Sequence, residues 1–238
     1  MIRVALIAVL LFLAALGPLS TPAQASFHFM QIEQVVGGIC GNSSAQVIQL
    51  RMRVAGQNLV AGARLTAFDA AGANPVTLLV FPSNVSTSTA GARVLIASTA
   101  AAPLLTGEDF TMTAHIPASY LAAGRLVFTD SSGTVIYWSV SWGGAGYTGS
   151  NAGNTANDAD GNFGPPFAAA LLPNTSQALQ FQGAFGAMST ANSTDYAYTT
   201  DDAAFVNNAG TAVTLPEDCL FGDDFETGGL GFWSLIFP

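Results

Sequence analysis

The strongest constraint on the fold is a period-two alternation of apolar and polar side chains in residues 46–54. Ile48, Leu50 and Met52 alternate there with Gln49 and Arg51. This pattern is typical of a β-strand with one buried and one wet face, because successive side chains of a strand point to opposite sides. A helix would distribute the same apolar residues around its axis.

Further short runs of this kind continue along the chain, separated by Gly, Asn, Pro and Asp-x-x-Gly turns about ten residues apart. We expect strands at residues 29–36, 64–69, 76–81, 93–98, 110–116, 125–129, 134–142, 178–182, 203–207 and 211–215. No stretch after the first 25 residues has a sustained helical period. The sequence therefore predicts an all-β protein, either a sandwich or a barrel.

Two of the turns share one chemistry, at residues 69–72 and 130–133. Each has an Asp that can accept turn amide hydrogens and a Gly that can take a positive φ. Arg64, Arg93 and Arg125 each begin an expected strand beside such Gly-containing segments. We expect these arginines to be solvated, the alternative being a binding cluster.

Trp138 and Trp142 fall on one face of the expected strand at residues 134–142, together with Ile136 and Val140, whereas Tyr137 falls on the other face. This spacing favours burial in a sandwich core. The alternative is an aromatic platform for sugars.

Charge is scarce and almost entirely negative. The 238 residues are 9% charged, against about 25% in an ordinary soluble domain, and the formal net charge is -9. Such a chain would be repelled by phosphate backbones, which excludes a nucleic-acid partner. The 50% hydrophobic content argues against full disorder.

The first 25 residues have the pattern of a cleaved signal peptide. Arg3 precedes an apolar run at residues 4–16, and small residues, Ala23 and Ala25, follow at a cleavage position. The run is shorter than the ~20 residues of a spanning helix, and we expect no transmembrane segment in the mature chain. The signal peptide predicts a protein that is secreted or on the cell surface. The Ala-rich, Lys-free composition indicates a bacterial origin.

Export makes the two cysteines interpretable together. An isolated pair in an oxidising compartment is more often bonded than free, so we expect a disulfide between Cys40 and Cys219. It would pin the C-terminal tail to the start of the folded body. The alternative is that one or both are buried thiols.

Asp158, Asp160 and Asn162 have the 1, 3, 5 spacing of oxygen ligands around calcium. Phe163 and Ala169 stand where an EF-hand would have Gly and a bidentate Glu. The sequence thus leaves two interpretations open, a calcium loop and an exposed acidic turn. No other cofactor is expected.

Enzyme motifs are absent from the sequence. There is no Gly-x-Ser-x-Gly, no His-Glu-x-x-His and no phosphate-binding Gly-rich loop. The adjacent acids at 108–109, 201–202 and 223–224 would point to opposite faces of a strand, so none is by itself a glycosidase pair. We therefore predict no catalytic residues, with an extracellular hydrolase as the alternative.

Five segments in order, at residues 45–52, 61–65, 81–84, 91–96 and 124–142, resemble the lamin-tail domain. The resemblance rests on an opening strand, a Gly-x-x-Leu strand, a Phe-Pro, a Gly-x-x-x-Leu-Ile strand and a closing hairpin with an Asp-x-x-Gly turn. It implies an immunoglobulin-like β-sandwich over residues 26–146. Such domains in exported bacterial proteins mostly serve as non-catalytic surface or accessory modules, so it also implies a binding or structural role. The partner of such a module would be a protein, a glycan or further copies of the same chain.

The C-terminal end resembles an acidic and aromatic tail that closes many exported bacterial proteins. The residues that carry this resemblance are Asp223, Asp224, Phe225, Glu226, Gly228 and Trp233. The resemblance implies a sorting or surface-retention element, the alternative being a closing strand of the sandwich.

We thus expect four parts: a signal peptide at 1–25, the sandwich at 26–146, a loop-rich and β-rich extension at 147–216, and the tail at 217–238. The predicted function is that of an exported, non-catalytic binding or structural module.

Overall fold

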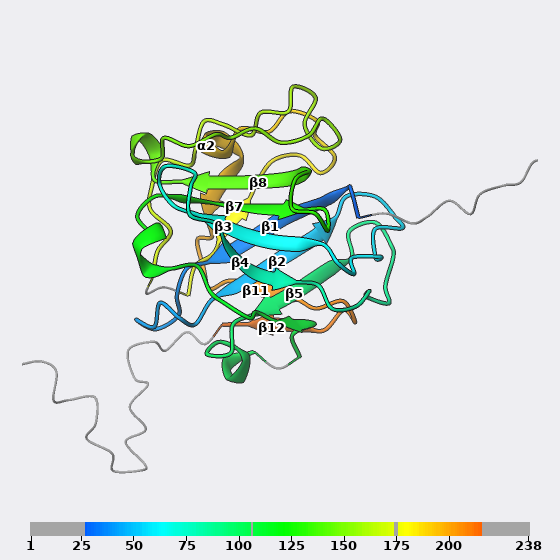
Figure 1. Ribbon diagram of the computed structural model, residues 1–238. Helices are drawn as coiled ribbons and strands as arrows, with labels where there is room; N and C mark the ends of the chain where they lie inside the picture. The colour runs from blue at the N-terminus through cyan, green and yellow to red at the C-terminus, as the bar shows by residue number, and fades with distance from the viewer. Residues whose placement is uncertain (1–26, 106, 174–175, 216–238) are drawn as a thin grey trace, which may run out of the picture.

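The computed structural model describes residues 27–105, 107–173 and 176–215, which form a β-sandwich (Figure 1). Two sheets face each other, and a small hairpin covers the outer side of one of them. The all-β prediction is confirmed, with the sandwich as the correct alternative.

The larger sheet has six strands in the order β10-β9-β1-β2-β5-β6. All neighbours pair antiparallel except β5 and β6, which are parallel. The strands are β1 Met30–Val36, β2 Val47–Met52, β5 Arg93–Ala97, β6 Phe110–Thr111, β9 Leu179–Phe181 and β10 Tyr196–Tyr198. β9 and β10 thus come from the expected extension and lengthen the sheet beyond β1.

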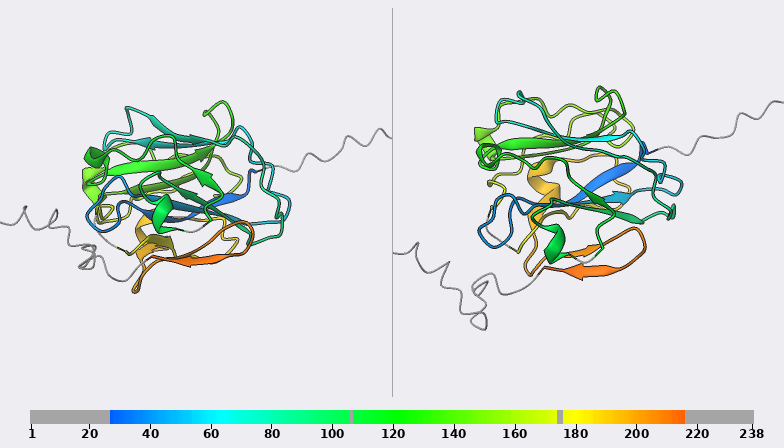
Figure 2. Two further views of the ribbon diagram at one scale, coloured as in Figure 1. Left: turned by 90° about the horizontal axis from the view of Figure 1, so that it is seen from below. Right: turned by 60° about the horizontal axis from the view of Figure 1, so that its bottom comes forward.

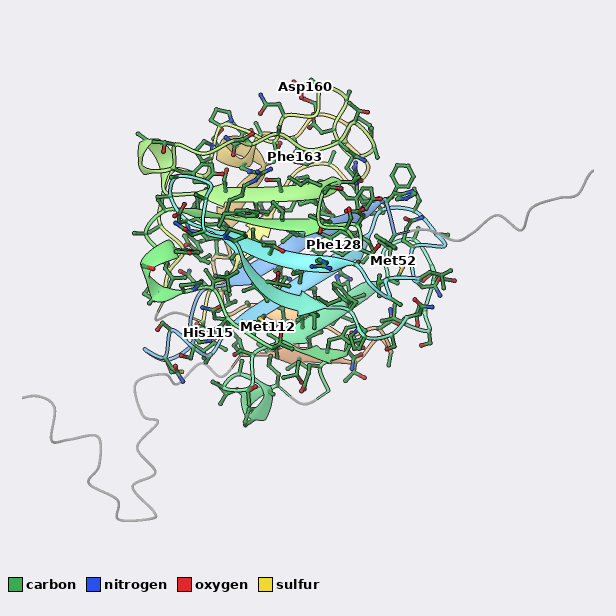
Figure 3. All side chains as sticks on the ribbon, viewed as in Figure 1. Met52, Met112, His115, Phe128, Asp160 and Phe163 are labelled. Atoms are coloured by element: carbon green, nitrogen blue, oxygen red, sulfur yellow. The ribbon has the colours of Figure 1, made fainter. Side chains whose placement is uncertain are left out.

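The smaller sheet has four antiparallel strands in the order β4-β3-β7-β8. They are β3 Arg64–Phe68, β4 Val76–Val80, β7 Gly124–Thr129 and β8 Ile136–Trp142. The main apolar core lies between the two sheets and includes Met52 and Phe128, which Figure 3 labels. It forms because the alternation seen in the sequence sends every second side chain of both sheets inward.

A third layer is the hairpin of β11 Ala204–Val206 and β12 Ala212–Thr214. It lies on the face of the six-stranded sheet that is turned away from the four-stranded sheet (Figure 2). A second apolar cluster joins them and includes Val47, Leu95 and Phe205.

Helices are short in the described residues. They are the 3₁₀ turns η1 Ala102–Leu104, η2 Ala118–Tyr120 and η3 Gly144–Gly146 and the α-helical turn α2 Asn192–Asp195. No helix within these residues has the length and apolar character needed to cross a membrane.

Ten of the eleven expected strands are confirmed to within a few residues. The eleventh, at residues 110–116, is paired only as far as Thr111. The backbone N–H of Met112 still bonds to the six-stranded sheet, but those of Thr113 and Ala114 both bond to Leu78 of β4. This segment therefore crosses between the sheets instead of continuing as a strand. β10 was not predicted.

A register shift in the β7–β8 pair corrects the expected faces of Ile136 and Tyr137. Phe128 pairs with Trp138 while Thr129 pairs with Ile136, which leaves Tyr137 as an extra residue, as in a β-bulge. Tyr137 packs in the core beside Phe128, at a centroid distance of 6.3 Å, and Ile136 is only half-buried. The bulge thus reverses the two side chains.

The two Asp turns form as expected. Asp69 accepts from the backbone N–H of Ala71 and Ala73, and Asp130 from those of Thr134 and Val135, all at 2.9 or 3.0 Å. The following glycines both have positive φ. The sequence interpretation of these turns is confirmed.

The expectation of solvated arginines is correct for Arg64 and wrong for Arg125. Arg64 is partly exposed and donates to the carbonyl of Ser131. Arg125 is buried, and its Nε donates to the hydroxyl of Ser139 at 2.7 Å. Burial lowers the pKa of Arg125. The loop after β8 covers Arg125 by accepting a hydrogen bond at the carbonyl of Ala152, a contact the sequence pattern cannot indicate.

Candidate binding groove

Trp138 and Trp142 are both fully buried, which confirms the core interpretation and excludes a surface platform. Their ring N–H groups are satisfied: Trp138 donates to the hydroxyl of Tyr196 at 2.8 Å and Trp142 to the carbonyl of Tyr120 at 2.9 Å. Aromatic stacking of a sugar at this strand is therefore not available.

The three residues with calcium spacing form consecutive side-chain turns. Asp158 accepts from the backbone N–H of Asp160, Asp160 from that of Asn162, and Asn162 from that of Gly164. Asp160 lies in the loops beyond β8 (Figure 3). Asp158 is buried and also accepts from the backbone N–H of Thr190. Burial, together with the Asp160 carboxyl beside it, raises the pKa of Asp158.

Asp158 also belongs to a junction that holds this loop on the sandwich. Arg53, at the end of β2, donates to the carbonyl and the side-chain oxygen of Asn157, each at 2.9 Å. Burial lowers the pKa of Arg53, and the nearby Asp158 carboxylate opposes that shift. Among the described residues no group of three or more His, Cys, Asp or Glu side chains could hold a metal ion. This geometry agrees with the acidic-turn interpretation. Calcium binding stays a prediction, and calorimetric titration with millimolar calcium would test it.

Several expected features lie outside the described residues. They are the signal peptide at 1–25, Cys219, and the tail residues Asp223, Asp224, Phe225, Glu226, Gly228 and Trp233. Cys40 is described, in a turn with φ 52°, but its bond to Cys219 stays a prediction.

The outer face of the six-stranded sheet carries a row of glutamines. Gln34 of β1 pairs in register with Gln49 of β2 on one side and with Gln180 of β9 on the other. Alternation places Gln49 and Gln180 on the outer face. Gln34 reaches that face because the register of β1 shifts between Ile32 and Gln34, so that Ile32 and Val35 point into the core. The row thus runs from β2 under the hairpin to β9, the strand next to the edge strand β10.

Glu33 lies at the register shift of β1 and forms ion pairs with Arg51 and Arg93. Its carboxylate accepts two hydrogen bonds from Arg93, at 2.7 and 3.0 Å, one from Arg51 at 3.4 Å and one from the Gln49 amide at 2.9 Å. The side chain of Glu33 is only 5% exposed. The register of β1 and β2 shifts at this residue, between Ile32 and Gln34. These are the ion pairs of the described part of the chain.

Two of the glutamines bind the hairpin directly. The Gln34 amide donates to the carbonyl of Ala204 at 3.0 Å, and the Gln49 Oε1 accepts from the backbone N–H of Val206 at 2.6 Å. The backbone of β11 is thus bonded to side-chain amides of the sheet beneath it, and not to the backbone of a neighbouring strand of that sheet. This positions the hairpin across the middle of the sheet and leaves β9 and β10 uncovered beside it.

The uncovered part is a groove of about 540 Å³ between β11 and the outer face of β9 and β10. Its lining is mostly amides, hydroxyls and carboxylates: Gln34, Gln180, Gln182, Ala197, Tyr198, Thr199, Thr200, Asp201, Asp202 and Ala204. No Arg, Lys or His belongs to this lining. We call it the glutamine groove.

Some hydrogen-bond acceptors of the glutamine groove have few or no partners among the described residues. Gln34 is 3% exposed, and its Oε1 has no partner among the described residues. Within the described residues, the Asp201 carboxylate accepts one hydrogen bond, from the hydroxyl of Thr200 at 3.3 Å, and the Asp202 carboxylate accepts none. A buried acceptor without a partner is costly, and the Gln34 Oε1 belongs to a residue that lines the groove.

The adjacent acids at 201–202 both lie at the glutamine groove. They follow β10 in a bend, so the strand argument for opposite faces does not apply to them, and both line the groove. The two histidines are elsewhere. His28 and His115 are exposed, and neither ring forms a hydrogen bond to a described residue.

Sequence reasoning did not find the glutamine groove. Its signal was present in the polar positions of the strand at residues 178–182, but alternation alone does not say which strand lies beside which. The groove depends on β9 pairing with β1 and on β10, which was not predicted.

Comparison with protein-family models and with curated proteins gives no match to this chain.

Proposed function

We propose that this protein is an exported, non-catalytic β-sandwich module that binds a glycan in the glutamine groove. The observation that carries the proposal is the groove's combination of planar amides, hydroxyls and carboxylates with the unpartnered Oε1 of Gln34. Sugars offer rows of hydroxyl donors, and polar groups fixed on a rigid sheet match such rows without reorganising.

The scaffold supports a binding role. Gln34 and Gln180 stand on paired strands, and the Gln34 amide is fixed by its bond to Ala204. A volume of about 540 Å³ is within the range of small-molecule sites. The resemblance to lamin-tail domains and the signal-peptide pattern both favour a module that acts outside the cell.

Blocking the groove tests the proposal. Ala197 is exposed on β10 and lines the groove, so Ala197→Trp should fill it. We expect this variant to lose retention on a glycan array that retains the unaltered protein. Ala212→Trp is the matched control, because Ala212 is also exposed on a strand but lies outside the groove lining. Equal retention of both variants would contradict the proposal.

A second candidate, an extracellular glycan hydrolase, is favoured by one observation: Asp201 and Asp202 line the same groove. Glycosidases use two carboxylates across the scissile bond. Incubation of the retained glycans with the protein, followed by product analysis, separates the two functions. Intact glycans agree with the binding module, whereas shortened chains that disappear in Asp201→Asn would establish the hydrolase.

A further inference from the structure

We infer that the glutamine groove selects glycans that carry free ammonium groups, such as de-N-acetylated amino-sugar chains, and rejects anionic glycans. This inference rests on the proposed function and adds the chemical class of its ligand. It is carried by the charges of the groove and by its inventory of hydrogen-bond donors and acceptors.

The charges of the groove are uncompensated. Asp201 and Asp202 line it, and neither forms an ion pair with a described residue. Arg51 and Arg93, basic residues of the neighbouring strands β2 and β5, are already bonded to Glu33. A uronate or sulfate would meet two carboxylates without a cation, whereas an ammonium group would be attracted by both.

The hydrogen-bond inventory points the same way. Two donors of the lining are already used: the Gln34 amide bonds to Ala204, and the Gln182 amide bonds to Gln180 at 3.1 Å. The acceptors left over are the Gln34 Oε1, the Gln182 Oε1 and the carboxylate oxygens of Asp201 and Asp202. They outnumber the donors left over, since among the amide groups of the three glutamines that of Gln180 alone donates to no described residue. The ligand must therefore be rich in donors.

An ammonium group has three donors and no acceptor, while an N-acetyl group replaces it with one N–H and a carbonyl oxygen. The hydroxyls of the same sugar supply further donors. A chain of glucosamine units thus matches the groove in both charge and donor number. A chain of N-acetylglucosamine units matches it only through its hydroxyls.

The test uses the purified protein and calorimetric titration with hexamers of glucosamine, N-acetylglucosamine, glucose and galacturonate, and with hexalysine. We expect the glucosamine hexamer to bind about tenfold more tightly than the N-acetylglucosamine hexamer, and the galacturonate hexamer not to bind. Asp202→Asn should reduce this preference to about threefold or less. Glu108→Gln, which removes one negative charge near β6 at the opposite edge of the sheet, should leave it unchanged.

The outcomes separate the two proposals. One outcome is that the glucosamine, N-acetylglucosamine and glucose hexamers bind equally and that Ala197→Trp abolishes this binding. It would overturn the inferred selection for ammonium groups but support the proposed glycan-binding function. Hexalysine binding as tight as that of the glucosamine hexamer would overturn a glycan as the ligand. Failure of every glycan to bind would overturn the proposed function itself.

Discussion

The two faces of the six-stranded sheet are covered by different means. The inner face meets the four-stranded sheet through a continuous apolar core that contains Leu50, Phe128 and Trp138. The outer face meets the β11–β12 hairpin partly through apolar residues and partly through the amides of Gln34 and Gln49. Apolar contact is non-directional and scales with area, whereas amide bonds fix position. The inner layer thus provides most of the stability, and the outer layer places the hairpin so that it bounds a groove.

The largest difference between the faces should appear on removing an aromatic ring. Phe128→Ala empties a fully buried site and should lower the free energy of unfolding by about 3–5 kcal/mol. Phe185→Ala is the matched control, since Phe185 is 49% exposed and lies over Arg51 at 4.3 Å from the ring centroid. It should cost about 1 kcal/mol or less. Denaturant unfolding measures both, and similar losses would contradict the comparison.

The next effect concerns the charges of the outer face. Glu33→Gln leaves Arg51 and Arg93 without their carboxylate and should cost about 1.5–3 kcal/mol. This loss of stability is smaller than that expected for breaking a fully buried ion pair, because the side chains of Arg51 and Arg93 are 29% and 31% exposed. Glu108→Gln, on a partly exposed side chain, should change stability by about 0.5 kcal/mol or less. A loss in Glu33→Gln no greater than in this control would show that the cluster does not stabilise the sheet.

A smaller, local effect should follow from the amide bonds to the hairpin. Gln34→Met keeps the side-chain length but removes the donor to Ala204, at a cost of about 1 kcal/mol. Hydrogen exchange should become faster in residues 204–214, while the amides of β7 and β8 keep their protection. Uniform acceleration over both sheets would mean that the hairpin does not open separately.

The smallest expected effect is a difference between the pKa values of two carboxylates, Asp130 and Asp109. Hydrogen bonds from the Ser132 hydroxyl and from turn amides outweigh slight burial and lower the pKa of Asp130, whereas burial raises the pKa of Asp109 beside the hairpin. Asp130 therefore contributes stability above the ordinary aspartate pKa of about 3.9 that is lost as pH falls through its folded value. Asp109 instead contributes stability below the ordinary aspartate pKa. That contribution is lost as pH rises through the pKa that Asp109 has in the folded protein. Carboxyl NMR titration should place the two pKa values on opposite sides of about 3.9, and the reverse order would refute this assignment.

How much the sequence predicts differs between the two faces. The inner face follows from alternation alone, since Ile48, Leu50 and Met52 are buried as expected. The outer face does not, because Gln34 and Gln180 become neighbours only when distant strands pair. Alternation marks a side chain as polar but does not say whether water, a hairpin or a ligand covers it.

Local irregularities limited the prediction as well. The bulge at Tyr137 exchanged two side chains between faces, and the segment after Thr111 crossed from one sheet to the other. Hydrogen bonds to residues outside the local segment accompany both: the Asn157 amide donates to the carbonyl of Tyr137, and the N–H of Thr113 donates to Leu78. No local pattern records such bonds. The Asp69 and Asp130 turns were predictable because their bonds are made within a few residues.

The strand order also sets the sequence of events during folding. β1 is flanked by β2 on one side and by β9 on the other, so one of its edges is filled only after residue 181 has been synthesised. Until then the growing chain carries an open edge on a strand that becomes internal, and open edges invite pairing with other chains. Because its closing contacts join distant parts of the chain, the domain should fold slowly and only after β9 and β10 have been synthesised.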